Sequence, residues 1–287
     1  MLDFHKENNA DVTFSVMPVP KEEASRFGIM ITDENRKVVD FEEKPAHPRS
    51  NLASMGIYIF NWKTLREALV TNKEQPNLDF GKHIIPYCRD KGAPLYAYEF
   101  NGYWKDVGTL TSYWEANMEL IDIVPEFNLY EEYWKIYTKS TSNVPQYFGT
   151  EGTAERTIIG EGTEIYGRVY NSVIGCDVTI GEGAEVRDSI LMNGTRVGAG
   201  SRLYKVIAAE NVTIGNGTVL GEGRDIPNET RSDIYRDGLV TLGEETEIPA
   251  GVRIGKNVMI SGVTTADDYP DGMLESGRTL VKEGDVE

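Results

Sequence analysis

Two neighbouring charged residues, Glu43 and Lys44, stand directly before Pro45 at the end of a strand-like segment, 37–44. Because proline ends the strand, both side chains can turn toward one cleft at the sheet edge where ligands sit in open α/β sheets. An ammonium can meet a phosphate as a point charge, and a carboxylate can accept hydrogen bonds from sugar hydroxyls. A solvated strand end with an incidental ion pair explains the two residues equally well.

A glycine and a serine stand at the start of other apolar stretches. Gly28 follows Arg26, so the backbone there can approach a ligand closely and the guanidinium can contact phosphate. A strand start with a surface arginine is the simpler interpretation of these two residues. Ser54 opens the segment 54–60, whose other residues are mostly apolar, and its hydroxyl can serve a ligand or cap the strand.

Two aspartates stand beside glycine and aromatic residues. Asp106 lies in the segment 102–109, Gly-Tyr-Trp-Lys-Asp-Val-Gly-Thr, where a carboxylate can hold a divalent metal or a sugar hydroxyl. A tight turn with a structural aspartate explains the same segment. Asp79, in Leu-Asp-Phe-Gly, is most simply the N-cap of a helix. The three histidines have no metal-ligand spacing to a cysteine or to one another.

The elements that would position these residues alternate between strand and helix over the first 125 residues, which predicts an α/β domain. Val12, Phe14 and Val16 share one face of the first strand, the period-two pattern of a half-buried strand. The strand-like segments are 11–19, 37–44, 54–60 and 94–100. The helix-like segments are 2–9, 62–69, 80–90 and 112–124.

Proline and capping residues set the expected ends of two helices. Pro86 predicts a kink or a stop within 80–90. The helix before Pro125 begins either at Ser112, which has capping-box spacing to Glu115, or at Thr109. Residues 126–154 have no clear period and are interpreted as a connection between domains.

From residue 155 to 287 an aliphatic residue recurs at every sixth position, often followed by glycine, as in Ile174-Gly175 and Ile180-Gly181. This period predicts a parallel β-helix in which the aliphatic side chain points inward at each turn. The following glycine lets the backbone turn a corner where a Cβ atom would clash. Residues 222–238 break the period and are expected to form an inserted loop.

Composition excludes several classes of partner. The formal net charge is −17, so most of the surface would repel nucleic acid and anionic lipid, although a local basic cluster can still bind a phosphate. There is no run of about 18 apolar residues, so a membrane span is not expected. Two cysteines far apart in the sequence predict no disulfide framework and favour the cytoplasm.

In their order along the chain, five motifs together resemble bacterial glucose-1-phosphate adenylyltransferase (ADP-glucose pyrophosphorylase). The motifs are Arg26-Phe27-Gly28, Glu43-Lys44-Pro45, Ala53-Ser54-Met55-Gly56, Asp79-Phe80-Gly81 and the segment 102–109. The Glu-Lys-Pro and Tyr-Trp-Lys-Asp-Val-Gly-Thr stretches are the most specific, and the resemblance covers essentially the whole chain. It implies an α/β domain with an incomplete nucleotidyltransferase-type mixed sheet in 1–125, followed by a left-handed parallel β-helix in 155–287.

The family makes ADP-glucose and diphosphate from ATP and glucose 1-phosphate in glycogen synthesis, and is allosterically regulated. The resemblance assigns glucose 1-phosphate binding to Gly28, Glu43, Lys44, Ser54, Tyr58, Asp79 and Trp104. Lys44 would bind the phosphate, and Glu43 and Ser54 would bind the sugar. The sugar pocket would be shaped by Tyr58, Asp79 and Trp104. Asp106 would be one of two carboxylates that hold Mg²⁺. No catalytic residue is assigned in this segment.

The chain also departs from the family pattern. No glycine-rich loop stands between a strand and a helix in the first 125 residues, and the family's ATP loop and second metal-binding aspartate are expected upstream of Met1. We therefore expect an incomplete catalytic domain with an unpaired sheet edge, and no ADP-glucose formation by this chain alone.

Two other functions compete with this one. A catalytically silent regulatory subunit that assembles through the β-helix is less favoured because Glu43, Lys44 and Asp106 are retained. A β-helix acyltransferase is disfavoured because all three histidines precede residue 84. The resemblance implies a homotetramer, or a heterotetramer with a paralogous subunit.

Overall fold

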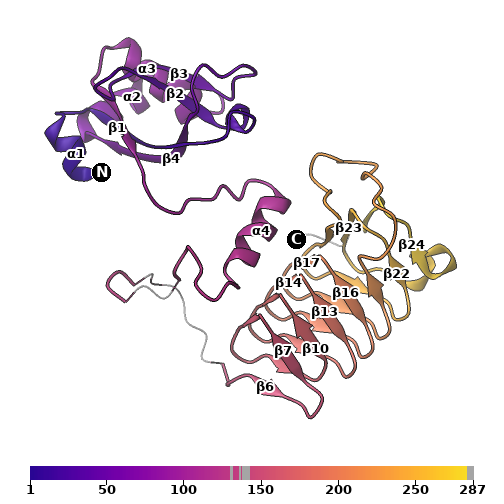
Figure 1. Ribbon diagram of the computed structural model, residues 1–287. Helices are drawn as coiled ribbons and strands as arrows, with labels where there is room; N and C mark the ends of the chain where they lie inside the picture. The colour runs from indigo at the N-terminus through magenta and orange to yellow at the C-terminus, as the bar shows by residue number, and fades with distance from the viewer. Residues whose placement is uncertain (130–131, 136, 138–142, 283–287) are drawn as a thin grey trace. The chain divides into compact units, whose positions relative to one another are not determined.

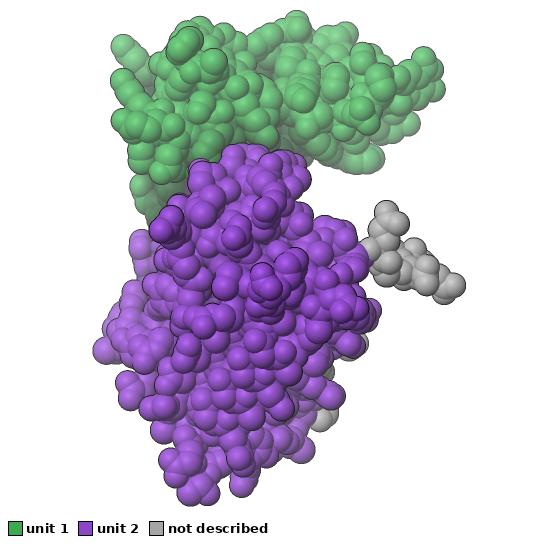
Figure 2. Space-filling model, turned by 90° about the vertical axis from the view of Figure 1, so that its right-hand side faces the viewer, with its two compact units in different colours: residues 1–102 green, residues 103–287 purple. Residues whose placement is uncertain are grey.

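The computed structural model describes residues 1–129, 132–135, 137 and 143–282 of the chain. It forms two compact units, Met1–Gly102 and Tyr103–Glu287, which are coloured separately in Figure 2. Part of the connection predicted over 126–154 lies outside the described residues, namely 130–131, 136 and 138–142.

Unit 1 is built on a mixed sheet, which has five strands in the described part of the chain and the order β3-β2-β4-β1-β5 (Figure 1). The strands are β1 (Val12–Pro18), β2 (Gly28–Thr32), β3 (Val38–Glu43), β4 (Leu52–Phe60) and β5 (Leu95–Glu99). Strand β1 is antiparallel to β4 and parallel to β5, and β2 is antiparallel to both β3 and β4. The predicted mixed sheet is confirmed, and β2 starts at Gly28, in agreement with the strand start that was the simpler interpretation of Arg26 and Gly28.

The two faces of β1 carry different side chains, as its period-two pattern predicts. Val12, Phe14 and Val16 are buried in the core with α2 (Trp62–Thr71) and α3 (Ile85–Asp90). On the other face the Thr13 hydroxyl lies 2.8 Å from Nδ1 of His5, on α1 (Leu2–Glu7). A short 3-10 turn, η1 (Ala24–Arg26), leads into β2.

The segment 80–90 is divided into two short helices instead of one. A π-helical turn, η2 (Phe80–Ile84), precedes α3, and Pro86 lies in the first turn of α3. Proline is tolerated there because the first amides of a helix have no partner within the helix. The kink or stop predicted within 80–90 is therefore a junction between two helices, and Pro86 lies at the start of the second one.

Helix α4 (Leu110–Glu119) ends earlier than the predicted 124, because the chain turns at Leu120. Thr109 is its N-cap and forms a capping box with Ser112, so the alternative box between Ser112 and Glu115 is not the one used. The sequence assigned this helix to the first domain, whereas in the structure it belongs to unit 2.

Unit 2 contains the predicted parallel β-helix, whose described strands form three sheets (Figure 1). One sheet holds β6 (Tyr147–Phe148), β9 (Glu164–Ile165), β12 (Thr179–Ile180), β15 (Arg196–Val197), β18 (Thr213–Ile214) and β21 (Glu247–Ile248). The second holds β7 (Thr153–Glu155), β10 (Arg168–Tyr170), β13 (Glu185–Arg187), β16 (Arg202–Tyr204), β19 (Val219–Leu220), β22 (Arg253–Ile254) and β24 (Met273–Leu274). The third holds β8 (Ile158–Ile159), β11 (Val173–Ile174), β14 (Ile190–Leu191), β17 (Val206–Ala208), β20 (Val240–Leu242), β23 (Val258–Ser261) and β25 (Thr279–Val281). Two 3-10 turns, η3 (Ala266–Asp268) and η4 (Pro270–Gly272), lie between β23 and β24.

The six-residue repeat forms the core of this β-helix. The aliphatic positions point inward and are buried, as at Ile174 and Ile180. The glycine that follows packs against the next coil: a Cβ atom on Gly181 would lie 2.6 Å from the backbone nitrogen of Ala199. Residues 222–238 form the expected insertion between β19 and β20.

Helix α4 is held on the β-helix by apolar and polar contacts. Its side chains Leu110, Tyr113, Trp114 and Met118 pack on the buried cluster of Ile190, Ile207 and Leu239. Trp114 donates from Nε1 to the Asp188 carbonyl at 2.7 Å, and the Lys205 ammonium lies 4.9 Å from the centre of a Trp114 ring. Within the described ranges no helix is both long enough and apolar enough to span a membrane.

Candidate functional site

Glu43 is the last residue of β3 and pairs with Gly28, the first residue of β2. A Cβ atom on Gly28 would lie 2.7 Å from Cζ of Phe41 and 3.0 Å from Oε2 of Glu43. Any larger residue would therefore push against both side chains. The glycine expected to let a ligand approach the backbone also gives space to the Glu43 carboxylate.

The first turn of η2 borders the same carboxylate. Asp79 accepts a hydrogen bond from the Lys82 amide at 2.8 Å and caps this turn, as predicted. Two residues later, a Cβ atom on Gly81 would lie 2.5 Å from Oε2 of Glu43 and 3.3 Å from Oδ1 of Asp79. The Glu43 and Asp79 carboxylates therefore meet around Gly81, which gives the site two groups of hydrogen-bond acceptors.

Strand β4 supplies two hydroxyl groups. Its register with β1 shifts between Phe14 and Val16, and Gly56 in this irregular part of β4 has a φ of 74°, a conformation that favours glycine. Ser54 and Tyr58 lie on either side of this bulge. Burial raises the pKa of Tyr58 above its ordinary value; a hydrogen bond with Ser54 acts against this shift, and the charges of Glu43 and Asp79 add to it. The Tyr58 hydroxyl is therefore close enough to Glu43 and Asp79 to be affected by their charges.

An aromatic wall stands beside these polar groups. The rings of Tyr58 and Phe80 are stacked, with centroids 5.9 Å apart and an interplanar angle of 14°. Phe14 and Phe60 each meet Tyr58 edge to face. This packing fixes the Tyr58 ring, and with it the direction in which its hydroxyl points.

Lys44 directly follows Glu43 and is exposed. Its φ of 46° places it in the left-handed region, which non-glycine residues rarely adopt. The Lys44 amide donates to the Phe27 carbonyl at 3.1 Å, which ties the residue to the start of β2. In the described part of the chain its ammonium has no hydrogen-bond or ion-pair partner. The charge is therefore open to an anion.

Unit 1 thus brings together most of the predicted sugar-phosphate residues: Gly28, Glu43, Ser54, Tyr58 and Asp79, with Lys44 next to Glu43 along the chain. Phe80 and Gly81 complete the group and were not predicted as site residues. Both residues stand in the Asp79-Phe80-Gly81 motif of the resemblance, and Gly81 also carries a local signal, because a glycine inside a helical pattern is normally unfavourable.

The segment 103–109, with the predicted residues Trp104 and Asp106, belongs to unit 2. Helix α4 braces it: Lys105 forms ion pairs with Glu115 at 3.1 Å and Glu119 at 2.5 Å, and Tyr103 donates to Glu119 at 2.7 Å. Burial disfavours the charged form of Lys105, but its hydrogen bonds with Glu119 and Glu115 outweigh this and raise its pKa. The Lys105 ammonium is therefore paired with two carboxylates of α4.

Gly108 lies close to the Asp106 carboxylate. A Cβ atom on Gly108 would lie 3.1 and 3.2 Å from the two carboxylate oxygens of Asp106, so the glycine leaves space on that side. Over the described ranges, no three residues among His, Cys, Asp and Glu gather in the way that would hold a metal by protein ligands alone. One carboxylate with phosphate oxygens is, however, a common way to bind Mg²⁺.

Comparison with known families defines the class of protein. Residues 1–123 match the nucleotidyl transferase family, and residues 141–242 match the GlmU-like C-terminal hexapeptide family. The mixed sheet and the β-helix correspond to these two matches. The chain is therefore a nucleotidyltransferase with a hexapeptide-repeat β-helix.

Curated relatives narrow this class to one family. The chain is 58% identical to a glucose-1-phosphate adenylyltransferase of Lachnospira eligens over 285 residues, which cover 99% of this chain and 67% of the relative. It is 49% identical to one of Acetivibrio thermocellus, covering 100% of this chain and 68% of the relative. It is 47% identical to one of Thermotoga neapolitana, over 96% of this chain and 66% of the relative. The chain belongs to the glucose-1-phosphate adenylyltransferase family and spans about two thirds of the length of these relatives.

Proposed function

We propose that this chain carries the glucose 1-phosphate site of a glucose-1-phosphate adenylyltransferase, which converts ATP and α-D-glucose 1-phosphate to ADP-glucose and diphosphate. The observation that carries the proposal is the meeting of Glu43 and Asp79 around Gly81, next to the Ser54 and Tyr58 hydroxyls. A sugar with several hydroxyls needs many acceptors and donors in a small space, and these side chains supply both.

In this proposal Glu43 accepts hydrogen bonds from the sugar hydroxyls, and Ser54 exchanges a further one. Gly28 allows the sugar and the Glu43 carboxylate to approach the backbone of β2. Tyr58 and Asp79 shape the sugar pocket, a role that family resemblance also gives to Trp104. The Lys44 ammonium meets the phosphate, where a point charge holds the anion without demanding one orientation.

The reaction joins the phosphate of glucose 1-phosphate to the α-phosphorus of ATP. Correct placement of the attacking oxygen is the contribution expected of the residues in unit 1, because a bound and oriented nucleophile reacts much faster than a free one. Asp106 is the residue proposed to hold Mg²⁺ together with substrate phosphates. When bound, the ion would neutralise charge on the phosphates and on the leaving diphosphate.

The remaining assignments follow from family membership. We propose that the working assembly is a tetramer, formed by this chain or with a paralogous subunit, and that it acts in the cytoplasm on ATP and glucose 1-phosphate. Both cysteines, Cys88 and Cys176, are free, as is usual in a reducing compartment.

Replacing the proposed phosphate ligand tests this function. The Lys44→Ala variant should bind glucose 1-phosphate at least about tenfold more weakly by calorimetry, because it removes a charge at the phosphate. Its melting temperature should be unchanged, since the ammonium has no partner in the described part of unit 1. Lys63→Ala, an exposed lysine on α2, is the matched control and should bind normally.

Equal affinity in the wild-type chain and the Lys44→Ala variant would contradict the assignment. If the wild-type chain binds no glucose 1-phosphate but still assembles with family members, the regulatory-subunit function is supported instead.

A further inference from the structure

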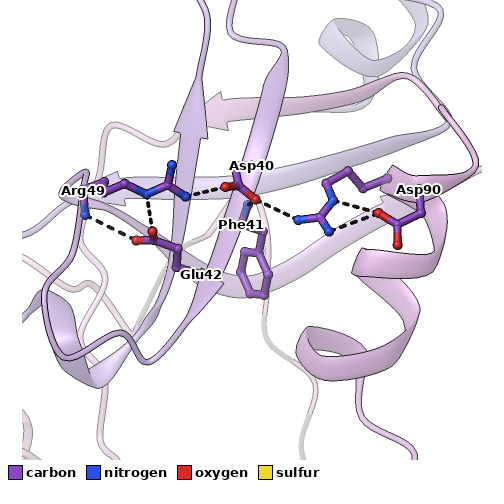
Figure 3. Close-up of polar contacts among 6 residues, drawn as sticks. Asp40, Phe41, Glu42, Arg49 and Asp90 are labelled. Atoms are coloured by element: carbon purple, nitrogen blue, oxygen red, sulfur yellow. Dashed lines mark hydrogen bonds and ion pairs between the residues drawn. The ribbon is translucent and has the colours of Figure 1, made fainter.

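A network of charged side chains joins the loop after β3 to β3 itself and to helix α3 (Figure 3). The Arg49 guanidinium forms ion pairs with both Asp40 and Glu42, through Nη2 and Nε respectively. The Arg49 backbone amide also donates to Glu42 at 3.3 Å. Asp40 and Glu42 are two residues apart on β3, so one planar guanidinium can join two carboxylates on the same side of the strand.

The network is also fixed at its other end. Arg89 near the end of α3 donates to Asp40 at 2.7 Å and binds Asp90 through two nitrogens at 3.1 and 3.0 Å. Because of the hydrogen bond from Arg49, the pKa of Asp40 lies below its ordinary value, and the Phe41 amide contributes to the same shift. Asp40 therefore stays ionised between two arginines and connects the edge strand to helix α3.

Arg49 stands in the loop that carries the proposed phosphate ligand. Lys44 follows β3 and Arg49 comes shortly before β4, so the loop between these strands has Lys44 at one end and Arg49 near the other. The first end is tied to β2 by the Lys44 amide, and the second is tied back onto β3 by the Arg49 side chain. The left-handed conformation of Lys44 is unfavourable for a residue with a side chain and persists only where surrounding contacts hold it.

We propose that Arg49 is a positioning residue for glucose 1-phosphate binding: by holding the loop against Asp40 and Glu42 of β3, it keeps Lys44 where its ammonium meets the phosphate. This inference rests on the proposed function. Arg49 itself touches no substrate. It acts by reducing the number of loop conformations that binding would otherwise have to exclude.

The proposal predicts a specific order among substitutions of Arg49. Arg49→Ala should weaken glucose 1-phosphate binding about three- to tenfold, less than Lys44→Ala, because the loop can still reach the bound conformation. Arg49→Lys should give an intermediate loss, since an ammonium cannot contact both carboxylates with the geometry of a guanidinium. Arg36→Ala is the matched control, because Arg36 is also exposed and paired, with Glu99 at 3.8 Å, and should not change binding.

A double-mutant cycle on the full chain, measured by calorimetry, tests whether Arg49 acts through Lys44. In the Lys44→Ala background, Arg49→Ala should cause no further loss of affinity. Melting temperatures of all variants show that each is folded, and Arg49→Lys keeps the test decisive if Arg49→Ala unfolds.

The outcomes separate the inference from the function on which it rests. If Lys44→Ala has normal affinity, the proposed function fails. If Lys44→Ala is weakened while neither Arg49→Ala nor Arg49→Lys is, the positioning role is wrong and the function stands. An equal loss from Arg49→Ala with and without Lys44 overturns the inference too, because Arg49 would then act on another part of the site.

Discussion

Replacing Gly81 by alanine changes the proposed sugar pocket with a single added methyl group. Real Cβ atoms essentially never come within 3.0 Å of such a neighbour, and this one would start 2.5 Å from Oε2 of Glu43 and 3.3 Å from Oδ1 of Asp79. The carboxylate of Glu43 must therefore move by about 0.5 Å or more, since it is the flexible end of its side chain.

The effects on stability and on binding should have different sizes. Alanine is up to about 1 kcal/mol better than glycine inside a helix, so stability should change by no more than about that amount. A hydrogen bond to a charged group contributes about 1.5–3 kcal/mol, and a displaced Glu43 should lose part of it. We expect a loss of about 1–2 kcal/mol in binding, or about 5- to 30-fold in the dissociation constant of glucose 1-phosphate.

Calorimetry with glucose 1-phosphate measures the effect of Gly81→Ala, and the Glu43→Ala variant supplies its control. Once Glu43 is absent, the added methyl group has little to displace, so the same substitution should cost much less affinity. Unchanged affinity in the wild-type background would refute the reasoning. So would an equal loss in both backgrounds, because the methyl group would then act on something other than Glu43.

Three further outcomes are expected in unit 2. Trp114→Phe removes the donor to the Asp188 carbonyl and should lower the free energy of unfolding by about 1 kcal/mol in urea titrations, whereas Trp62→Phe, on an exposed residue, should not. Burial disfavours the charged form of Glu119, but its hydrogen bonds with a lysine and a tyrosine outweigh burial and lower its pKa in the folded chain. The contribution of this carboxylate to the free energy of unfolding is complete above the ordinary pKa of 4.5 and is lost as the pH falls through the folded pKa. Glu119→Gln should therefore lose less stability than wild type on acidification. Ile180→Ala should cost about 2–5 kcal/mol, because the side chain is fully buried in the β-helix; a loss below about 1 kcal/mol would show that the core collapses around the gap.

The regular parts of the fold could be predicted from the sequence because each has a short period. The alternation of apolar and polar residues along β1 and the six-residue repeat of the β-helix both indicate which side chains face inward. The six-residue repeat did not predict the first coil of the β-helix. This coil begins with β6 (Tyr147–Phe148), before the predicted start at 155, where aromatic residues take the place of the aliphatic ones. The packing of α4 on the β-helix could not be predicted, because the apolar face of a helix does not indicate which surface it covers.

Some members of the candidate site could be proposed from the residues alone. Glu43 and Lys44 are charged residues at the end of a strand, where a sequence pattern can be interpreted locally, whereas Asp79 was interpreted as an N-cap and was assigned to the site only by the family resemblance. The closeness of Gly81 to Glu43 could not be predicted, because it depends on how η2 lies beside the end of β3. The role of Arg49 was missed as well, since its two carboxylate partners precede it on another element.

A crystal structure of the chain with glucose 1-phosphate tests the central claim most directly. The account predicts a phosphate oxygen within hydrogen-bond distance of Nζ of Lys44 and at least one sugar hydroxyl on the Glu43 carboxylate, beside Gly81. A sugar phosphate bound elsewhere on the chain, or bound beside Glu43 with its phosphate turned away from Lys44, would contradict it.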